Sequence, residues 1–232
     1  MRTTFIPLFA ISFFFSIAQA QTIIYEENSR VIVEIESVPH TGWTKGSTTI
    51  GSNTITYLYA TSEFLNTPGR NLLSYKIKIN NPGTYRFVWH SKVGKGTSPT
   101  DHNDSWLRIP DAAAFYAKKD EASIIRPKGV CTNDCPNGTG SDGWFKVYSN
   151  STLDWTFNRS WTSDHDPHAI YARFEEAGIY TVEISIRSDY HYLDRFVMFD
   201  ETKHTLSQST NLSLSPSSSE DKSSISGKVS EF

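Results

Sequence analysis

One stretch near the end of the chain, residues 177–199, constrains the fold more than any other. After Gly178, apolar and polar residues alternate strictly, which predicts a strand with one buried face. The apolar set is Tyr180, Val182, Ile184 and Ile186. A polar loop leads to a second apolar run, residues 193–199, which is interrupted by Asp194 and Arg195. Asp194 needs a partner there, because an unpaired charge in an apolar layer is costly.

Shorter alternating or aromatic runs elsewhere predict further strands. These runs are residues 30–37, 73–79, 84–89, 106–109, 143–149, 153–157 and a segment that ends at Phe174. The NNPG sequence at residues 80–83 predicts a turn that closes a hairpin, and a similar glycine turn recurs at Gly178. Residues 40–71 are expected to be loop-rich, and residues 112–119 to form one or two helical turns.

Many short strands with turns between them, and no long amphipathic helix, predict an all-β protein. The expected architecture is an antiparallel β-sandwich. Trp89 is in phase with the apolar face of its strand and is expected in the core, and Trp155 and Phe157 are also assigned to the core rather than to a site.

The composition divides the chain into three segments. Residues 1–20 have a charged start, an apolar centre and a small-x-small site, which predicts a cleaved signal peptide and a secreted protein. That apolar run is too short for a membrane anchor, and no later stretch is apolar enough to span a bilayer. Residues 21–200 carry the predicted strands, and residues 201–232 are rich in Ser and Thr, which predicts a flexible tail or linker. Either the tail links to other extracellular modules of a longer product, or it is a spacer.

Charge and cysteine content exclude some functions. The formal net charge is -3 and no basic patch is present, which argues against a nucleic-acid partner. Cys131 and Cys135 are the only cysteines, and in an exported protein their spacing predicts a local disulfide that pins a loop. A metal site would need more ligands than this pair supplies, and a redox role would normally use Cys-x-x-Cys.

Glu34 and Glu36 share one face of the strand predicted at residues 30–37. Two stacked carboxylates repel each other, so either this face is solvated or a cation lies between them. Calcium would suit such a pair, because hard oxygen ligands are those it prefers.

The order of motifs along residues 25–200 resembles a known family. Glu-x-Glu, PGTYRFVW, NDSWLRI, a Trp-rich pair, AGIYTVEISIRS and LDRFVMF follow one another. This order is similar to that of galactose-binding-like jelly-roll modules, above all calcium-containing carbohydrate-binding modules of the family 6 and 35 type. Such modules occur in secreted polysaccharide-degrading proteins and are not catalytic. The insertion at residues 118–142 departs from a minimal module.

The resemblance implies a metal site and a sugar site. A structural calcium would be held by Glu34, Glu36 and Asp194, which would give Asp194 its partner. Loop aromatics would stack on sugar rings while polar groups pair with the hydroxyls. The residues expected to bind carbohydrate are Trp43, Trp106, Trp161, Tyr190, His191 and Asp104. Trp144 is a further aromatic candidate.

Three functions remain open at this point. The first is a non-catalytic module that binds polysaccharide. The second is an extracellular structural or adhesive domain that binds protein. The third is a glycoside hydrolase or lyase with paired carboxylates. The third has the weakest support, since no spacing singles out an acid and a nucleophile, and no nucleophile motif such as Gly-x-Ser-x-Gly occurs.

Overall fold

The structure is a computed structural model that describes residues 21–129, 143–149, 152–157, 160–163 and 166–222. The predicted signal peptide and the Cys131–Cys135 pair lie outside these residues, so both stay predictions.

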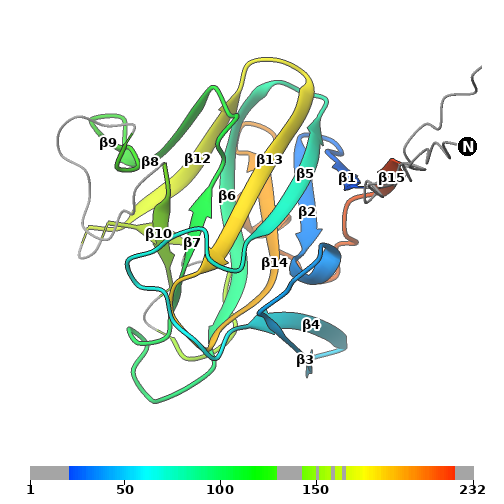
Figure 1. Cartoon of the computed structure of the whole chain (residues 1–232). Helices are drawn as coiled ribbons and strands as arrows, with labels where there is room; N and C mark the ends of the chain where they lie inside the picture. The colour runs from blue at the N-terminus through cyan, green and yellow to red at the C-terminus, as the bar shows by residue number, and fades with distance from the viewer. Residues whose placement is uncertain (1–20, 130–142, 150–151, 158–159, 164–165, 223–232) are drawn as a thin grey trace, which may run out of the picture.

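Strands make up most of the described chain (Figure 1). The first half contains β1 (Gln21–Tyr25), β2 (Arg30–Glu34), the 3₁₀ turn η1 (Ile35–Ser37), β3 (Thr44–Ile50), β4 (Asn53–Tyr59), β5 (Leu73–Ile79), β6 (Gly83–Val93) and β7 (Asp104–Arg108). The second half contains β8 (Ala114–Asp120), β9 (Ser123–Ile125), β10 (Phe145–Tyr148), β11 (Trp161–Thr162), β12 (His168–Phe174), β13 (Gly178–Ile186), β14 (His191–Asp200), α1 (Leu206–Ser209) and β15 (Ser219–Lys222).

The strands form two facing layers, as the sequence predicts. One layer runs β15-β1-β5-β13-β7-β10, and β11 joins it to a second layer that runs β12-β6-β14-β4-β3. In the second layer β2 also pairs with β14, and β8 with β12. Pairing is antiparallel throughout except between β1 and β5, which are parallel. The protein is therefore a β-sandwich with a mixed, largely antiparallel sheet, and Figure 1 shows β13 and β5 in front of β6 and β14.

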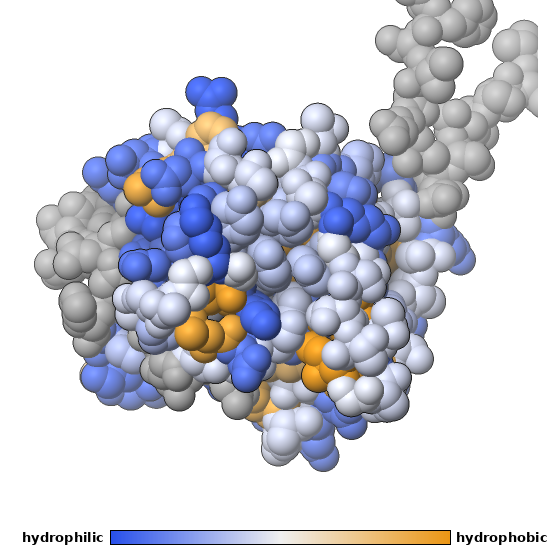
Figure 2. Space-filling view, turned by 90° about the horizontal axis from the view of Figure 1, so that it is seen from below, coloured by the Kyte–Doolittle hydropathy of each residue, from blue (hydrophilic) through white to orange (hydrophobic). Residues whose placement is uncertain are grey.

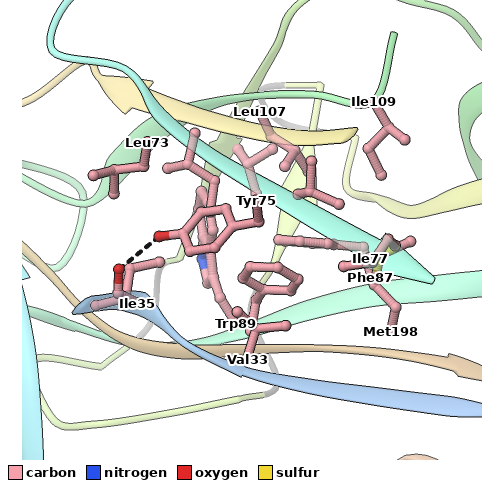
Figure 3. Packing of buried hydrophobic residues seen from close by; sticks show 14 of the residues in the cluster. Val33, Ile35, Leu73, Tyr75, Ile77, Phe87, Trp89, Leu107, Ile109 and Met198 are labelled. Carbon is pink, nitrogen blue, oxygen red and sulfur yellow. Dashed lines mark hydrogen bonds between the residues drawn. The ribbon is translucent and has the colours of Figure 1, made fainter. Parts of the chain in front are cut away.

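The core lies between the layers and is built by the alternation seen in the sequence. Alternate residues of β5, β6 and β13 point inward, and beyond the first residues of β6 and β13 they are fully or almost fully buried, including Tyr75, Phe87 and Trp89. Trp89 is thus a core residue, as predicted. The one polar atom of Tyr75 is satisfied, since its hydroxyl donates a hydrogen bond of 2.7 Å to the carbonyl of Ile35 (Figure 3).

The two predicted hairpins are wrong, because the strands on either side of each turn do not pair with each other. β5 pairs with β1 and β13, whereas β6 pairs with β12 and β14, so the NNPG turn carries the chain from one layer to the other. The turn before β13 does the same, because β12 and β13 also belong to different layers. Alternation reveals that each strand has one buried face but does not reveal its neighbours. The buried carboxylate of Glu26 fixes the first turn by accepting hydrogen bonds from the backbone amides of Asn80 and Asn81.

Four local predictions also need correction. The region expected to be loop at residues 40–71 contains the β3–β4 hairpin, and the segment expected to be helical at residues 112–119 forms β8 against β12. In the described part of residues 153–157, only a single bridge between Thr156 and Ser91 forms. The strand expected over residues 30–37 ends at Glu34 and turns into η1. Thr-rich strands and polar edge strands lack a strong apolar signal, and tertiary pairing decides their state.

The Ser/Thr-rich segment after Asp200 differs from the expected flexible tail in its described part, which ends at Lys222. β15 pairs with β1, and Leu206, Leu212 and Leu214 pack on the outer face of the second layer. Arg195 donates to the carbonyl of Leu214 at 3.1 Å. A few leucines suffice here because the segment covers an existing apolar face and needs no core of its own. Within the described residues, no helix is long and apolar enough to cross a membrane.

Candidate functional site

Five partly exposed aromatic residues gather at one end of the second layer. They are Tyr57, Tyr59, Trp155, Tyr190 and Tyr192, and we call them the aromatic platform. Tyr57 and Tyr192 stack with ring centroids 4.7 Å apart and planes 18° apart. Tyr59 lies 4.7 Å from Tyr192 and 5.8 Å from Tyr190, and Trp155 meets the edge of Tyr57 at 5.3 Å. The rings form a continuous row in which each touches the next.

Strand periodicity explains why these rings share a face. Leu58 of β4 lies opposite Leu193 of β14, and both side chains are fully buried in the core. The residues that flank this pair, Tyr57, Tyr59 and Tyr192, must therefore point outward. Burial and, after it, the neighbouring tyrosines Tyr57, Tyr59 and Tyr190 raise the pKa of the Tyr192 hydroxyl, so this phenol is neutral near neutral pH.

Two glycines provide the space in which two platform rings lie. Gly46 of β3 is paired with Tyr57, and a Cβ atom at Gly46 would lie 2.5 Å from Cζ of that ring. A Cβ atom at Gly94 would overlap the ring of Tyr192. Neither glycine has a positive φ, so it is the rings rather than the backbone that require glycine here.

Replacing Gly94 with alanine is therefore expected to tilt Tyr192 off the platform. We expect ligand affinity to fall about tenfold, equivalent to about 1.4 kcal/mol, with a small change in stability. Calorimetric titration alongside thermal melting measures both, with Gly83→Ala as the control because Gly83 has no positive φ and the nearest atom to a Cβ position there lies at an ordinary contact distance of 3.4 Å. Unchanged affinity in Gly94→Ala would show that Tyr192 does not contribute to binding.

A polar cavity of about 460 Å³ borders the platform at Trp155. Its other lining residues are Thr48, Thr49, Ile50, Lys92 and Asp154. Hydroxyl, ammonium and carboxylate groups beside a flat ring can pair with a ligand rich in hydroxyls. Figure 2 looks at the molecule from below Figure 1 and shows only small, separate orange areas among pale and blue residues. The face in that view has no broad aliphatic patch.

Several residues expected to bind carbohydrate are buried, which corrects their assignment. Trp106 is 2% exposed and donates its indole N–H to the carbonyl of Phe64, and Trp43 donates to the carbonyl of Asn71 at 2.7 Å. Their ring faces are packed, so they offer no stacking surface. Trp144, also a candidate, is buried beneath Arg108.

The two buried polar candidates are held by the protein itself. Nδ1 of His191 lies 2.9 Å from the hydroxyl of Ser105, and the ring packs against Trp89. The carboxylate of Asp104 accepts hydrogen bonds from Arg187 and Ser188. Both side chains are buried and held by partners that are distant in sequence, although Asp104 also lines a polar cavity of about 290 Å³.

Tyr190 and Trp161 are partly exposed, in keeping with a surface role. Tyr190 belongs to the platform and has a left-handed φ of 51°, an uncommon conformation that is frequent at functional sites. Trp161 lies in β11 between Tyr148 and Ala169. The sequence analysis did not predict Tyr57, Tyr59 and Tyr192 as binding residues and assigned Trp155 to the core. The Tyr-x-Tyr spacing in β4 and at residues 190–192 is the sequence signal that could have indicated these tyrosines.

The outer face of the first layer is covered near Trp106. The backbone amide of Gly69 donates to the hydroxyl of Ser185, and the amide of Ile186 donates to the carbonyl of Arg70. The segment before β5 therefore lies on β13 and β7 and closes this part of the sheet face. The platform at the end of the second layer, by contrast, is partly exposed.

The three predicted metal ligands, Glu34, Glu36 and Asp194, lie near one another, and we call them the carboxylate cluster. The ladder between β14 and β6 shifts register between Leu193 and Arg195, and such a bulge re-aims the side chain of Asp194. Asp194 is fully buried, and its Oδ2 accepts a hydrogen bond of 2.8 Å from Nδ1 of His90. Oδ1 has no hydrogen-bond partner among the described residues.

Burial, together with the neighbouring negative charges, raises the pKa values of the other two carboxyl groups. Burial raises the pKa of Glu34 to about 7; the charge of Arg195 opposes this, and the charges of Asp194 and Glu36 add to it. Arg195 lies opposite Glu34 in the β2–β14 ladder, and its Nη2 is 2.6 Å from Oε1 of Glu34. Burial also raises the pKa of Glu36, whose Oε2 is buried without a partner in the described part of the chain.

This arrangement fits a divalent cation in its chemistry. Among the described residues, no group of three His, Cys, Asp or Glu side chains is placed so that it could hold a metal ion. However, the cluster has two buried carboxylate oxygens without partners, and buried polar atoms are normally paired. Oxygen ligands of this kind are those that calcium prefers. The sequence predicted that Asp194 needs a partner but not that His90 and Arg195 supply part of it.

Comparison with known proteins finds likeness in structure. No protein-family profile matches the sequence, and no curated protein matches it. The C-terminal family 6 carbohydrate-binding module of a marine laminarinase from Zobellia galactanivorans matches 74% of this chain and 99% of its own, at 13% identity and a TM-score of 0.39. Carbohydrate-binding module CBM6cm-2 of Cellvibrio mixtus lichenase 5A, solved with cellotriose, matches 73% and 96% at 10% identity and a TM-score of 0.34.

Both of these solved structures are carbohydrate-binding modules, and each match covers about three-quarters of this chain. The two sequences share too little with this chain to assign any site residue.

Proposed function

We propose that this protein is a non-catalytic carbohydrate-binding module that binds polysaccharide on the aromatic platform. The observation that carries the proposal is the row of five partly exposed rings, two of them seated on glycines, beside a polar cavity. Sugar rings present apolar C–H faces and a rim of hydroxyls, so they need a flat apolar surface with polar groups at its edge. The platform and the side chains of Lys92 and Asp154 supply these two elements.

Retention on polysaccharide tests this function directly. Affinity electrophoresis in gels that contain laminarin, lichenan or soluble cellulose derivatives should retard the wild-type protein. A Tyr57→Ala, Tyr192→Ala double variant should migrate as in a gel without polysaccharide. If the wild type is not retarded by any member of a broad glycan panel, while a pull-down recovers a protein partner, the chain is an adhesive domain. Release of reducing sugar from the same panel would instead identify an enzyme.

The carboxylate cluster is proposed to hold a structural calcium through Glu34, Glu36 and Asp194. A bound divalent cation would supply positive charge between carboxylates that otherwise repel one another. Two side chains of the protein assist: Arg195 neutralises part of the negative charge of Glu34, and His90 holds one oxygen of Asp194 by a hydrogen bond. The two unpartnered oxygens of Asp194 and Glu36 are the expected first ligands.

Calcium at a concentration about 100 times its dissociation constant should raise the melting temperature by about 5–10 °C, because a ligand that binds only the folded state stabilises it by roughly 2.7 kcal/mol. A chelator should remove the whole shift. Asp194→Asn should melt at the same temperature with and without calcium, whereas Asp154→Asn, a carboxylate outside the cluster, should keep the shift. Identical wild-type melting temperatures in calcium and in chelator would show that no metal stabilises the fold.

The proposed setting is extracellular. Residues 1–20 would direct export and be removed, and the Ser/Thr-rich residues after β15 would link this module to other extracellular modules. N-terminal sequencing of the exported protein, with Gln21 as the expected first residue, tests the leader.

A further inference from the structure

A single histidine touches both the carboxylate cluster and the aromatic platform. His90 lies in β6 and is 3% exposed. Its Nδ1 donates to Oδ2 of Asp194 at 2.8 Å. Its ring stacks on Trp155, with centroids 5.0 Å apart and planes 30° apart, and on Phe157 at 4.5 Å and 23°. One side chain therefore bridges a buried carboxylate and a ligand-facing ring.

Trp155 depends on this contact more than the other platform rings do. The four tyrosines belong to β4, to β14 or to the turn that enters β14, whereas Trp155 lies outside any strand. Its segment is attached to β6 by two backbone hydrogen bonds between Thr156 and Ser91, at 2.9 and 3.1 Å. The indole itself rests on His90 and meets Tyr57 and Tyr192 on its other contacts. The position of the His90 ring thus sets where the Trp155 ring can lie.

The orientation of His90 depends in turn on Asp194. The two oxygens of that carboxylate have different surroundings, because Oδ2 contacts His90 and lies 3.6 Å from Nε of Arg195, whereas Oδ1 has no hydrogen-bond partner among the described residues. The carboxylate is rigid and planar, so a group that binds Oδ1 also fixes the direction in which Oδ2 accepts. A group bound at Oδ1 would therefore fix the imidazole of His90 through one hydrogen bond, and the indole of Trp155 through one stacking contact.

We propose that His90 is a positioning residue that couples the carboxylate cluster to the platform, so that a divalent cation and a glycan each strengthen the binding of the other. This inference rests on the proposed function. Coupling through equilibrium binding is reciprocal: the factor by which calcium raises glycan affinity must equal the factor by which glycan raises calcium affinity. For a path of two contacts we expect a factor of about 5, at the lower end of the usual range.

Two substitutions separate the hydrogen bond from the ring. His90→Phe keeps a ring for Trp155 but has no donor for Asp194, and His90→Asn keeps a donor near the Nδ1 position but has no ring. His168→Asn is the matched control, because His168 is also buried and hydrogen-bonded to Ser123 but makes no contact with the platform or the cluster. Each variant is titrated by calorimetry with the polysaccharide that retards the wild type, in calcium and in chelator, and with calcium in the presence and absence of that polysaccharide.

In the wild type and in His168→Asn, glycan affinity should be about 5-fold higher in calcium, and calcium affinity should be higher by the same factor with glycan present. In His90→Phe and His90→Asn both factors should fall to about 1. A role for His90 in stability alone would lower the melting temperature and leave the factors intact, which would overturn the proposal.

The outcomes also distinguish a failure of the coupling from a failure of the proposed polysaccharide binding. If wild-type glycan affinity is lost in Trp155→Ala but is the same in calcium and chelator, the binding function stands and the coupling is refuted. If the wild type binds no polysaccharide in either condition, the proposed function and the coupling both fail. Equal coupling in the wild type and both His90 variants would place the path elsewhere and refute the role of His90.

Discussion

Trp155→Ala is expected to weaken polysaccharide binding by at least about 30-fold, or about 2 kcal/mol, while the domain stays folded. Trp155 is the platform ring that borders the polar cavity, so its removal takes away apolar contact at the point where hydroxyl partners are also available. Large rings that a ligand covers fully usually carry most of the binding free energy. Calorimetric titration measures the affinity, and urea unfolding measures the stability.

The control for this prediction is Trp161→Ala. Trp161 is also partly exposed but lies in β11, where it pairs with Tyr148 of β10 and Ala169 of β12. Its replacement should change affinity by less than about 2-fold. A larger loss in Trp161→Ala than in Trp155→Ala would move the binding surface to β11 and contradict the assignment of the platform.

Acid is expected to destabilise the fold through His191. Burial lowers the pKa of His191 to about 4, with the charge of Asp104 acting in the opposite direction, and an unfolded histidine has a pKa of about 6.5. Between these values the unfolded chain binds a proton that the folded protein excludes. The contribution to stability is therefore fully present above about pH 6.5 and is lost as the pH falls towards about 4, where the loss reaches roughly 3 kcal/mol.

Urea unfolding at about pH 7 and about pH 4.5 tests this sign and size. Other groups also titrate in this range, Glu34 among them, so the informative quantity is the difference between the wild type and His191→Leu. The variant should lose about 2–3 kcal/mol less than the wild type on going to the lower pH. Equal losses in both proteins would show that His191 is protonated in the folded state.

Alternation predicted strands because it records which face of a strand is buried, and it does not record which strands are neighbours. Residues 73–79 and the region of Gly178 were predicted correctly as strand and strand start, yet both predicted hairpins turned out to cross between layers. Register and layer come from contacts between segments more than 100 residues apart, such as β5 with β13.

The same reason explains the errors at the predicted sugar site. Trp106 and Trp43 have polar neighbours in sequence, but backbone carbonyls from distant segments accept their indole N–H groups and cover them. The platform could have been suspected from Tyr57-x-Tyr59 and Tyr190-x-Tyr192, which put rings on one face of two strands. That the two strands pair at Leu58 and Leu193 could not be read from the sequence.

The carboxylate cluster was predicted from the resemblance and from the cost of burying Asp194. The structure brings Glu34, Glu36 and Asp194 within electrostatic range of one another, since the charge of Asp194 helps to raise the pKa of both Glu34 and Glu36. The cross-strand pair of Glu34 with Arg195 depends on the register of β2 on β14, and the hydrogen bond from His90 depends on the bulge at Asp194. Neither register nor bulge has a signature in this sequence.

Chemical-shift mapping by NMR during titration with the retained polysaccharide tests the central claim most directly. We predict that the indole N–H of Trp155 and the backbone amides of Tyr57, Tyr59, Tyr190 and Tyr192 shift together and saturate at one dissociation constant. Shifts confined to the segment that covers Trp106, or to β11, with the platform signals unmoved, would contradict the account.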